Sequence, residues 1–393
     1  MKILMINSVC GIRSTGRICT DLATTLEAEG HVVKIGYGRE NVPEKYERFA
    51  IRIGTKKDVI LHGLKARLID ADGQGSVQAT KKFLKWVRLY DPDIIHLHNL
   101  HGYYINFPEL FQYIIENNKR VIWTLHDMWA FTGHGCICDG LGCDKWKTGC
   151  GHCIAKKGYP RTIIDRSSYN YKKKKACFTA ALDLTLITPS KWLANLAKMS
   201  YFKDNVIDVI PNGIDLEQFK YIDSDFRDKH DLREKIVILG CSTWWGKGKG
   251  LYDFYRLSEL LDDRFKIILV GLNDEQINGC PDKIMGIKRT DSVQELAKLY
   301  STADVFFNPT YIDNYPTVNL EALACGTPVI TYETGGSAEC LDGKNGKMFK
   351  QGDIEGVANY LMTQYAKTSF CISNTDMLSK ETTCKRYLQI FNI

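Results

Sequence analysis

The feature that most constrains the fold is an alternation between short, continuously apolar segments and segments with apolar residues every three or four positions. The short segments fall at 2–9, 32–37, 94–98, 121–126 and 184–188, and then at 236–241, 266–271, 305–309 and 328–331. The helical patterns between them include 18–26, 251–261, 293–300 and 318–323. Because strands that read as unbroken apolar runs are buried on both faces, the alternation predicts parallel sheets covered by helices.

The alternation begins again near Ile236, after the turn-rich Pro211-Asn212-Gly213 and a charged segment at 223–234. It therefore predicts two doubly wound α/β domains. We expect the first domain over residues 1–200, with a cysteine-rich insertion at about 134–155, and the second over residues 201–370. Ligands of such folds bind beyond the carboxyl ends of the strands, so functional residues are expected directly after strands in both domains.

The charge is divided unevenly between the two halves of the chain. Residues 1–200 hold 30 Lys and Arg against 18 Asp and Glu, whereas residues 201–393 hold 22 against 28. A basic first domain suits a phosphate-bearing ligand or a membrane surface, and a solvated lysine-rich surface is the alternative reading, notably at 172–175. Because the basic residues are dispersed and no recognised motif accompanies them, no nucleic-acid partner is expected.

The sequence also bears on the compartment. No apolar run approaches the ~20 residues of a membrane-spanning helix. The first residues read as a strand and not as a signal peptide. We therefore expect a cytoplasmic protein, in which the 14 cysteines are thiols or metal ligands before they are disulfides.

Polar residues follow several strands of the first domain. Gly16 and Arg17 lie where a glycine turn enters a helix, which can bind an anion or be an ordinary turn. The third long strand ends in a polar, aromatic stretch that suits a hydroxylated ligand better than a metal, with His98, Asn99, His101 and Tyr103 as candidates. His126 follows the next strand and can exchange a hydrogen bond with a substrate near neutral pH.

The cysteine-rich insertion holds Cys136, Cys138, Cys143, Cys150 and Cys153. Four thiolates from this set could bind a structural zinc ion, and the candidates are Cys136, Cys143, Cys150 and Cys153. Buried or free thiols are the alternative. Cys150 and Cys153 form a CxxC pair. Redox catalysis is not expected, because no thioredoxin-like context surrounds this pair.

The second domain carries charged groups and glycines after its strands. Lys247 and Lys249 lie among glycines at the head of a helix and can cradle a phosphate without a metal. Asp313 precedes a predicted helix and Glu321 lies more than one turn inside it, so the two carboxylates can hold separate hydroxyls of one sugar-containing ligand. Gly335-Gly336 follow another strand and can present amides to a phosphate.

The segment from Asp313 to Glu321 is similar to the E-x7-E signature of retaining glycosyltransferases of the GT-B fold, family four. Residues 322–330, 209–215 and 335–339 resemble the same family. Residues 91–106 and 125–153 resemble a bacterial subgroup that extends exopolysaccharide, capsule or O-antigen repeat units. The resemblance spans residues 1–365 and implies a GT-B architecture, with two Rossmann-like domains facing a central cleft. It also implies that the tail at 371–393 crosses back to the first domain.

The resemblance implies a hexosyltransferase that uses a UDP- or GDP-linked sugar and a saccharide acceptor. The basic first half suits an acceptor linked to a lipid diphosphate, with peripheral contact at the cytoplasmic face of the inner membrane. Retention of configuration would follow from attack on the face that the diphosphate leaves, with its oxygen taking the proton. No cofactor is expected for catalysis, because fixed cations and helix N-termini can stabilise the leaving diphosphate.

The implied roles can be placed on this sequence residue by residue. Glu321 would hydrogen-bond the ribose, Lys249 would neutralise the diphosphate, and His126 would contact the donor hexose near the reacting carbon. Asp313 would hold the hydroxyls of the donor sugar. The remaining donor-side residues would be Gly16, Arg17, Lys247, Asn314, Tyr315, Pro316, Thr317, Val318, Gly335 and Gly336, and the acceptor side would be lined by His98, Asn99, His101 and Tyr103.

Two positions depart from the family pattern, and two alternative functions stay open. The first carboxylate of the signature is Asp313 instead of Glu, and Trp244 stands where the family has Arg, with Lys247 nearby. A nucleotide-sugar epimerase of the same fold would convert the donor without an acceptor, although the long aromatic acceptor stretch argues against it. A non-catalytic relative would bind a glycan or nucleotide and never release the nucleotide from its sugar.

Overall fold

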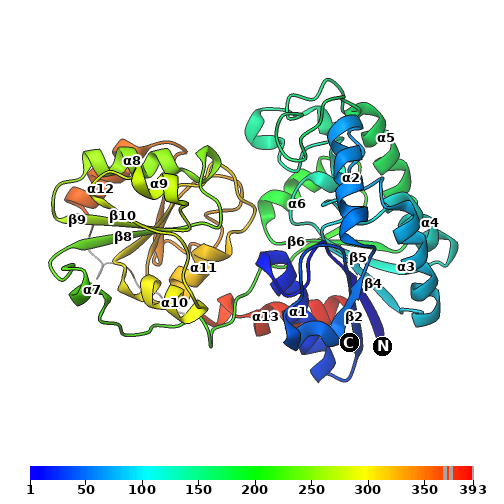
Figure 1. The fold of residues 1–393 in the computed structure, drawn as a ribbon, viewed down its shortest axis with the longest axis horizontal. Coiled ribbons are helices and arrows are strands. Elements are labelled where there is room, and N and C mark those ends of the chain that lie inside the picture. Colours follow the sequence, from blue (N-terminus) through cyan, green and yellow to red (C-terminus); the bar gives the residue numbers. More distant parts are fainter. Residues whose placement is uncertain (366–369, 371–374, 392–393) are drawn as a thin grey trace. The chain divides into compact units, whose positions relative to one another are not determined.

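The chain folds into two compact units (Figure 1). The computed structural model describes residues 1–365, 370 and 375–391. Unit 1 comprises Met1–Pro211 and Cys384–Ile393, and unit 2 comprises Asn212–Thr383. The first boundary therefore lies beyond the expected residue 200, and residues 371–374 and 392–393 of the expected tail lie outside the described residues. Within the described chain, no helix combines the length and apolar character needed to cross a membrane.

Unit 1 is built on a parallel sheet that has seven strands in the described residues, in the order β3-β2-β1-β4-β5-β6-β7. The strands are β1 (Lys2–Ile6), β2 (Val32–Tyr37), β3 (Ala50–Arg52), β4 (Ile94–Leu97), β5 (Arg120–Thr124), β6 (Leu184–Thr188) and β7 (Val206–Val209). The helices are α1 (Arg13–Ala28), α2 (Lys56–Ile69), α3 (Val77–Tyr90), α4 (Phe107–Glu116), α5 (Ser167–Phe178) and α6 (Lys191–Lys198). The last described helix is α13 (Lys380–Phe391), which belongs to unit 1 from Cys384 onward. The strand order reverses between β1 and β4, which is where this fold class binds ligands.

Unit 2 repeats this plan with six parallel strands in its described part, in the order β10-β9-β8-β11-β12-β13. Its strands are β8 (Ile236–Cys241), β9 (Phe265–Val270), β10 (Ile284–Ile287), β11 (Val305–Asn308), β12 (Val329–Tyr332) and β13 (Gly346–Phe349). Its helices are α7 (Phe226–Lys229), α8 (Leu251–Leu260), α9 (Asp274–Asn278), α10 (Val293–Thr302), α11 (Thr317–Ala324) and α12 (Ile354–Thr363). The prediction of two doubly wound parallel α/β domains is confirmed.

The strands that the sequence pattern missed are the outermost ones. β3 and β7 end the first sheet, and β10 and β13 end the second. All residues of β3 are only partly buried, and in β7 Val206 is exposed. An edge strand has a neighbour on one side only and lacks the covered faces that produce a continuous apolar run.

Helix α13 is hydrogen-bonded to β5, in the middle of the unit 1 sheet. The side chain of Arg120 on β5 donates hydrogen bonds to the carbonyl oxygens of Ile390 (2.7 Å) and Phe391 (3.2 Å). The hydroxyl groups of Tyr387 and Thr124 are 2.9 Å apart, and Thr124 Oγ1 also lies 2.9 Å from His96 Nε2 on β4. The side chains of Tyr387, Thr124 and His96 are buried and hydrogen-bond one another, so α13 completes the core of unit 1.

We expect the substitution Tyr387→Phe to destabilise unit 1 by about 1 kcal/mol, because it removes one buried hydrogen bond and leaves the volume of the ring in place. The measurement is urea unfolding followed by far-ultraviolet circular dichroism. Tyr221→Phe, at a side chain that is 66% exposed, is the matched control and should leave the unfolding curve unchanged. Equal stability of the Tyr387→Phe and wild-type proteins would contradict a structural role for the Tyr387–Thr124 contact.

Candidate functional site

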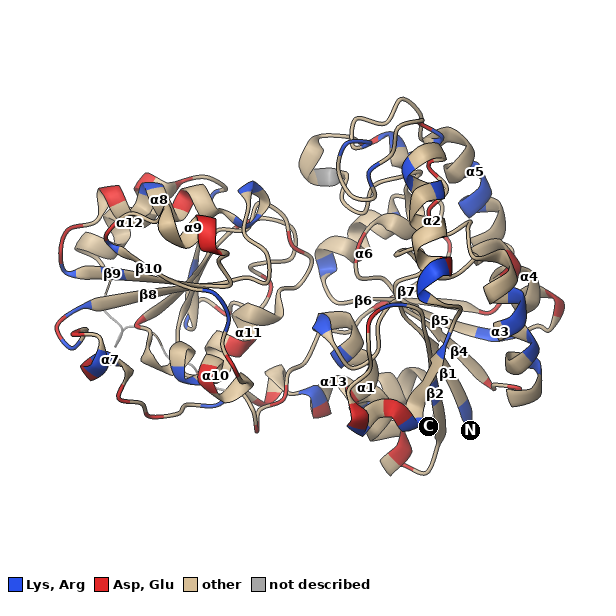
Figure 2. Cartoon of the chain, viewed as in Figure 1, with Lys and Arg blue, Asp and Glu red and all other residues tan. Residues whose placement is uncertain are grey.

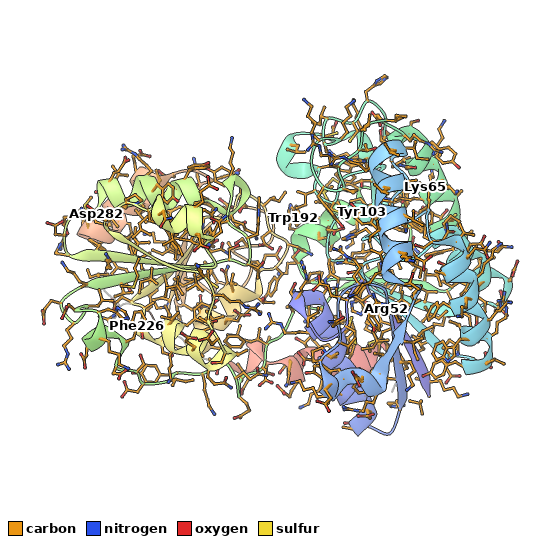
Figure 3. The ribbon with its side chains drawn as sticks, in the orientation of Figure 1. Arg52, Lys65, Tyr103, Trp192, Phe226 and Asp282 are labelled. Atoms are coloured by element: carbon orange, nitrogen blue, oxygen red, sulfur yellow. The ribbon has the colours of Figure 1, made fainter. Side chains whose placement is uncertain are left out.

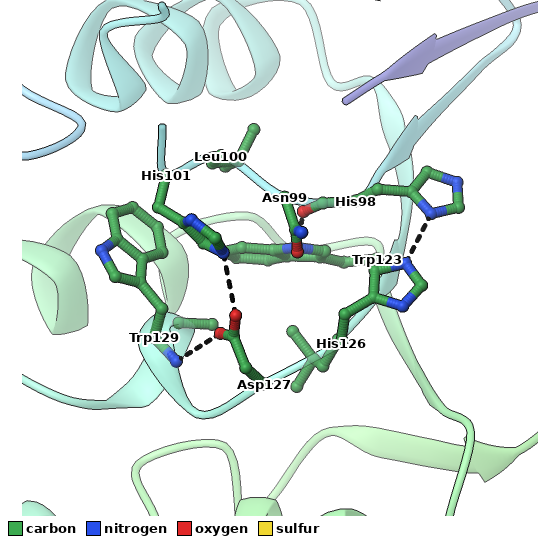
Figure 4. Close-up of a pocket in the computed structure, with 10 residues that line it drawn as sticks. His98, Asn99, Leu100, His101, Trp123, His126, Asp127 and Trp129 are labelled. Carbon is green, nitrogen blue, oxygen red and sulfur yellow. Dashed lines mark hydrogen bonds and ion pairs between the residues drawn. The ribbon is translucent and has the colours of Figure 1, made fainter. Parts of the chain in front are cut away.

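The candidate site of unit 1 lies at the carboxyl ends of β1, β4 and β5. These strands are neighbours in the sheet, so the residues that follow them meet at one edge. The backbone N–H of Asn99 after β4 donates to Asn7 Oδ1 after β1 at 3.3 Å. Figure 4 shows the residues after β4 and β5, including His98, His101, His126 and Asp127, around one small cavity.

His98 and His126 contact each other directly. The distance from His98 Nδ1 to His126 Nε2 is 3.0 Å, and the two rings are stacked (Figure 4). Burial lowers the pKa of His126 to about 4 and holds the pKa of His98 well below its usual value. Both imidazoles are therefore neutral at pH 7, and one donates its N–H to the other. This pair can therefore offer a hydrogen bond to a hydroxyl group. Neither ring carries a positive charge at pH 7.

His101 and Asp127 form a second pair in the same place. His101 Nε2 lies 2.8 Å from Asp127 Oδ2, and the backbone N–H of Trp129 donates to Asp127 Oδ1 at 2.8 Å (Figure 4). Burial alone would lower the pKa of His101, but the Asp127 carboxylate raises it above the usual value. Burial opposes the ionised form of Asp127, yet His101 lowers the pKa of this carboxyl. Sequence reasoning missed Asp127, although it directly follows the candidate His126.

The cavity between these groups has a volume of about 10 Å³, which is about the space of one water molecule. It is lined by His98, Asn99, His101, His126 and Asp127 among others. Tyr103 does not line it and instead packs near His62 and Tyr159. Unit 1 therefore brings four of the predicted residues together at the carboxyl edge of its sheet and leaves Tyr103 outside this group.

Gly16 and Arg17 lie in the first turns of α1. The Gly16 carbonyl accepts a hydrogen bond from the Gly11 N–H at 3.1 Å, which closes the turn after β1. A Cβ atom at Gly16 would lie 3.1 Å from the Val9 side chain and 3.2 Å from the Gly11 nitrogen, so this position favours glycine. No side chain caps the N-terminus of α1, and Arg17 is exposed.

In unit 2, the candidate site is centred on an ion pair between Lys249 and Asp313. Lys249 follows β8 and Asp313 follows β11, which are the neighbouring strands at which the strand order reverses. The distance from Lys249 Nζ to Asp313 Oδ2 is 2.5 Å, and the two side chains are 36% and 22% exposed. Lys247 lies in the same short 3-10 turn and is exposed. A cation and a carboxylate thus lie together at the edge where this fold binds ligands.

Gly335 and Gly336 hold a third loop against this pair. Gly335 has a φ of +57°, and a Cβ atom there would lie 2.0 Å from the Asp313 carbonyl oxygen. The Gly336 N–H donates to that same oxygen at 3.0 Å. Only glycine tolerates both the conformation and the close approach. The loop after β12 therefore fixes the backbone of Asp313.

The remaining predicted donor residues lead from Asp313 into α11. The Asn314 N–H donates to Asp313 Oδ1 at 2.9 Å, and the Tyr315 carbonyl accepts from the Asn212 side chain at 3.2 Å. Pro316 precedes the first helical residues, Thr317 and Val318, and no side chain caps this helix end. Uncapped amides at a helix N-terminus favour an anionic group.

Glu321 is buried on α11 at 3% exposure. Its Oε2 accepts a hydrogen bond from the Tyr300 hydroxyl at 3.0 Å. A buried carboxylate requires such a partner, and Tyr300 supplies it from α10. Sequence reasoning missed Tyr300, because its contact with Glu321 depends on the packing of α10 against α11. Trp244, at the position where the resemblance expects Arg, is 66% exposed.

The candidate zinc ligands do not all lie together. Cys136 lies against His101 and Asp127, and among the described residues these are the three potential ligands whose atoms are within 4.8 Å of one another. Cys143, Cys150 and Cys153 instead neighbour Cys138. Among the described residues, no three members of the predicted set have their sulfur atoms within 4.8 Å of one another.

The buried histidines predict that unit 1 loses stability in mild acid. Burial lowers the pKa of His96 to about 3 and of His126 to about 4, and it also lowers the pKa of His98. Below about pH 6.5 the unfolded chain binds protons that the folded chain does not, so stability falls from there toward pH 4. His101 has a raised pKa and acts in the opposite direction. We expect a lower urea midpoint at pH 5 than at pH 7.5.

His96→Gln should weaken this pH dependence, because it removes one of the groups that take up a proton on unfolding. His230→Gln, at an exposed position of unit 2, is the control and should not change it. A urea midpoint for the wild type that stays constant or rises between pH 7.5 and pH 5 would contradict the neutral state of these histidines.

Comparisons with known proteins agree with this arrangement. The model of Glycosyltransferase Family 4 matches residues 15–218, and the model of Glycosyl transferases group 1 matches residues 233–366. The WcaC protein of Escherichia coli K12, named as a glycosyl transferase of colanic acid biosynthesis, is 26% identical over 295 residues, which cover 72% of this chain and 70% of WcaC.

Two further proteins extend the comparison. The N,N'-diacetylbacillosaminyl-diphospho-undecaprenol alpha-1,3-N-acetylgalactosaminyltransferase of Campylobacter jejuni is 26% identical over 150 residues, 35% of this chain and 39% of that protein. The structure of Anabaena HepE in complex with UDP superposes with a TM-score of 0.69 at 15% identity, over 100% of both chains. HepE therefore shares the fold. With a family model that matches more than half of its residues, the chain belongs to glycosyltransferase family 4.

Proposed function

We propose that this protein is a retaining glycosyltransferase that moves a hexose from a UDP- or GDP-linked sugar to a growing cell-surface polysaccharide. The acceptor is carried on a lipid diphosphate, and catalysis needs no metal ion. Unit 2 binds the donor and unit 1 the acceptor. The observation that carries the proposal is the Lys249–Asp313 ion pair at the strand-order reversal of unit 2.

The ion pair supplies what a nucleoside diphosphate requires. A half-buried lysine is a fixed cation that can stabilise the charge of the departing diphosphate. The incoming diphosphate would take Lys249 away from Asp313, and the Asp313 carboxylate would then accept hydrogen bonds from the hydroxyls of the donor sugar. Lys247 lies on a turn beside this pair and adds a second cation. The Gly335-Gly336 loop would add the Gly335 amide, since the Gly336 N–H donates to the Asp313 carbonyl.

The other proposed contacts with the donor are made by residues of α11. Glu321 lies about one turn along this helix, buried and oriented by Tyr300, and would accept hydrogen bonds from the ribose hydroxyls. The uncapped first turn of α11 favours negative charge near Thr317 and Val318. In this arrangement the nucleotide needs no bridging metal, and we expect activity to survive chelation by EDTA.

Retention of configuration requires that the acceptor attack the face from which the diphosphate departs. The departing diphosphate oxygen takes the proton of the acceptor hydroxyl, so no side chain needs to act as a strong base. The neutral His126 would contribute a hydrogen bond to the hexose near the reacting carbon, oriented by its contact with His98. His98, Asn99 and His101 would lie on the acceptor side.

A lipid-linked acceptor is supported by the surface of α2. Ile60, Leu61, Leu64 and Leu68 are between 52% and 65% exposed and fall within about 100° of one another around the helix axis. The Ile163 and Ile164 N–H groups donate to the Arg67 and Leu68 carbonyls, and both isoleucines are exposed. We call these six exposed apolar side chains together the α2 face.

Basic residues flank the α2 face. Lys56 and Arg67 lie on one side of the apolar stripe and Lys65 lies on the other, and all three are exposed. Figure 2 shows the Lys and Arg positions on α2, and Figure 3 labels Lys65. Apolar residues bordered by cations are typical of a helix that lies in the interface of an anionic membrane. The name of the Campylobacter relative likewise refers to a diphospho-undecaprenol substrate.

We expect Lys249→Ala to lower the rate of nucleotide release by about 10²–10³-fold, because it removes the cation that faces the leaving group. The assay measures nucleotide release from a panel of UDP- and GDP-sugars, with and without a bacterial lipid extract. Lys298→Ala, at an exposed lysine on α10, is the control and should retain wild-type activity. Equal loss in both variants, or no loss in Lys249→Ala, would contradict the assignment of Lys249.

The same panel separates the alternative functions. Release from one donor that rises with lipid extract supports a transferase, and NMR of the product then shows whether the anomeric configuration is retained. Conversion of the donor to an epimer without an acceptor would indicate an epimerase. Tight nucleotide binding without release from any donor would indicate a non-catalytic relative.

We expect the protein to co-sediment with phosphatidylglycerol vesicles more strongly than with phosphatidylcholine vesicles, and salt should weaken the binding. The double variant Leu61→Gln/Leu64→Gln should lower the affinity at least about tenfold, because two apolar side chains no longer enter the membrane. Leu89→Gln/Leu182→Gln, at positions 86% and 95% exposed but outside α2, is the matched control. Vesicle binding that does not depend on the anionic lipid content would contradict a membrane contact through the α2 face. An equal loss of vesicle binding in both double variants would also contradict it.

A further inference from the structure

The cysteine-rich segment between β5 and α5 has little regular structure to hold it in place. Its described elements are the 3-10 turns Trp129–Phe131, Asp139–Leu141 and Lys145–Lys147, joined by loops (Figure 1). Trp146 is nevertheless fully buried and packs against Phe131 at a ring distance of 5.4 Å. A long loop that buries a tryptophan needs cross-connections, because its backbone lacks the hydrogen-bond ladder of a helix or sheet.

The cysteines of this segment fall into two groups. Cys136 lies with His101 and Asp127, as described above. Burial is the main cause that raises the pKa of the Cys138 thiol to about 12, and the nearby thiols of Cys153, Cys150 and Cys143 raise it further. Cys143 also neighbours Cys150, and Cys150 neighbours Cys153. The Cys138 thiol therefore lies near those of Cys143, Cys150 and Cys153. It also acts on Cys136, whose sulfur lies with His101 and Asp127.

Contacts of the backbone agree with this grouping. The Gly133 N–H donates to Cys150 Sγ at 3.2 Å, and a Cβ atom at Gly135 would lie 3.4 Å from Cys138 Sγ. The Gly133–Gly135 turn thus touches Cys138 from one part of the loop and Cys150 from another. The Cys143 N–H donates to the Cys138 carbonyl at 3.4 Å, which places these two residues on one tight turn.

The spacing of the four cysteines matches that of metal-binding pairs. Cys138 and Cys143 form a C-x4-C pair, and Cys150 and Cys153 form a C-x2-C pair. Structural zinc sites draw their ligands from pairs separated by two to four residues. Cys136 and Cys143 are separated by six residues and do not fit this pattern.

A buried cation lies beside the cluster. Lys174 is 2% exposed, and its ammonium donates to the carbonyl oxygens of Trp129 (2.7 Å) and Thr132 (3.1 Å). Its charge acts on Cys138 and Cys150, lowering the pKa of both thiols. The proposed catalytic groups do not use Lys174. Lys174 acts on Cys136 as well. A buried ammonium near Cys138 and Cys150 is a counter-charge for thiolates at these two positions.

We propose that Cys138, Cys143, Cys150 and Cys153 bind one structural zinc ion through their four sulfur atoms. Each thiol releases its proton to solvent on binding, the ion stays Zn²⁺, and the resulting site carries two negative charges beside Lys174. Among the described residues, no three of the four sulfurs lie within 4.8 Å of one another. Binding therefore draws the two cysteine pairs together and tightens the loop around Trp146. The site is structural and does not depend on the proposed transferase activity.

The test measures zinc in the full-length protein, purified without chelators, by inductively coupled plasma mass spectrometry. We expect about one zinc ion per chain. Cys138→Ser and Cys150→Ser should each lower the bound zinc at least about tenfold. Cys136→Ser is the matched control, because it removes a cysteine of the same loop that faces His101 and Asp127, and it should retain the zinc.

A second measurement uses only the wild-type protein, in case the variants do not fold. After chelator treatment, addition of Co²⁺ should produce the intense thiolate-to-cobalt absorption of a tetrahedral sulfur site, and zinc should then displace the cobalt. Absence of zinc together with absence of this absorption would overturn the proposal. Loss of zinc in Cys136→Ser but not in Cys138→Ser would also overturn it and move the metal to the His101 group. Mass spectrometry that found these cysteines joined as disulfides would exclude the site as well.

Discussion

Parallel pairing of strands that are covered on both faces is the constraint on which both units depend. It requires unbroken apolar strands, and it directs every carboxyl strand end of a sheet to one edge. At that edge, β4 and β5 deliver His98 and His126 in unit 1, whereas β8 and β11 deliver Lys249 and Asp313 in unit 2. The functional groups come from loops, but their positions are set by the sheets. Loop residues can therefore differ between the units without a change of fold.

The two edges present different chemistry. In unit 1 the histidine pair is buried and neutral, since burial disfavours the imidazolium form. Such groups suit the recognition of hydroxyls on a saccharide. In unit 2 a lysine and an aspartate lie partly exposed at the sheet edge, and glycines allow backbone to approach them. This charged edge suits a diphosphate. The contrast is consistent with a glycosyltransferase in which one unit binds the acceptor and the other the nucleotide sugar.

Two surface features lie outside the sheet edges. The α2 face combines exposed aliphatic side chains with flanking cations, and in the cysteine loop Cys138 lies near the thiols of Cys143, Cys150 and Cys153. Neither follows from the strand–helix alternation. The sequence alone led to Cys136 as the fourth candidate ligand, although Cys138 and Cys143 form a C-x4-C pair. Which thiols share one location could be decided only by the folding of the loop, because Cys136 and Cys138 are two residues apart and face different neighbours.

The central strands, the helices between them and the order of the two units were determined by the sequence alone, because strands buried on both faces must be continuously apolar. The glycines and charged residues after those strands were predicted to bind ligands, because ligands of such folds bind beyond the carboxyl ends of the strands. The edge strands β3, β7, β10 and β13 were not, because partial exposure relaxes that requirement. Only the tertiary structure decided that Tyr300 supports Glu321, that Asp127 pairs with His101, and that the sulfur of Cys136 lies with this pair. These contacts join residues from different elements, and no local pattern records which side chains meet when helices and loops pack on a sheet.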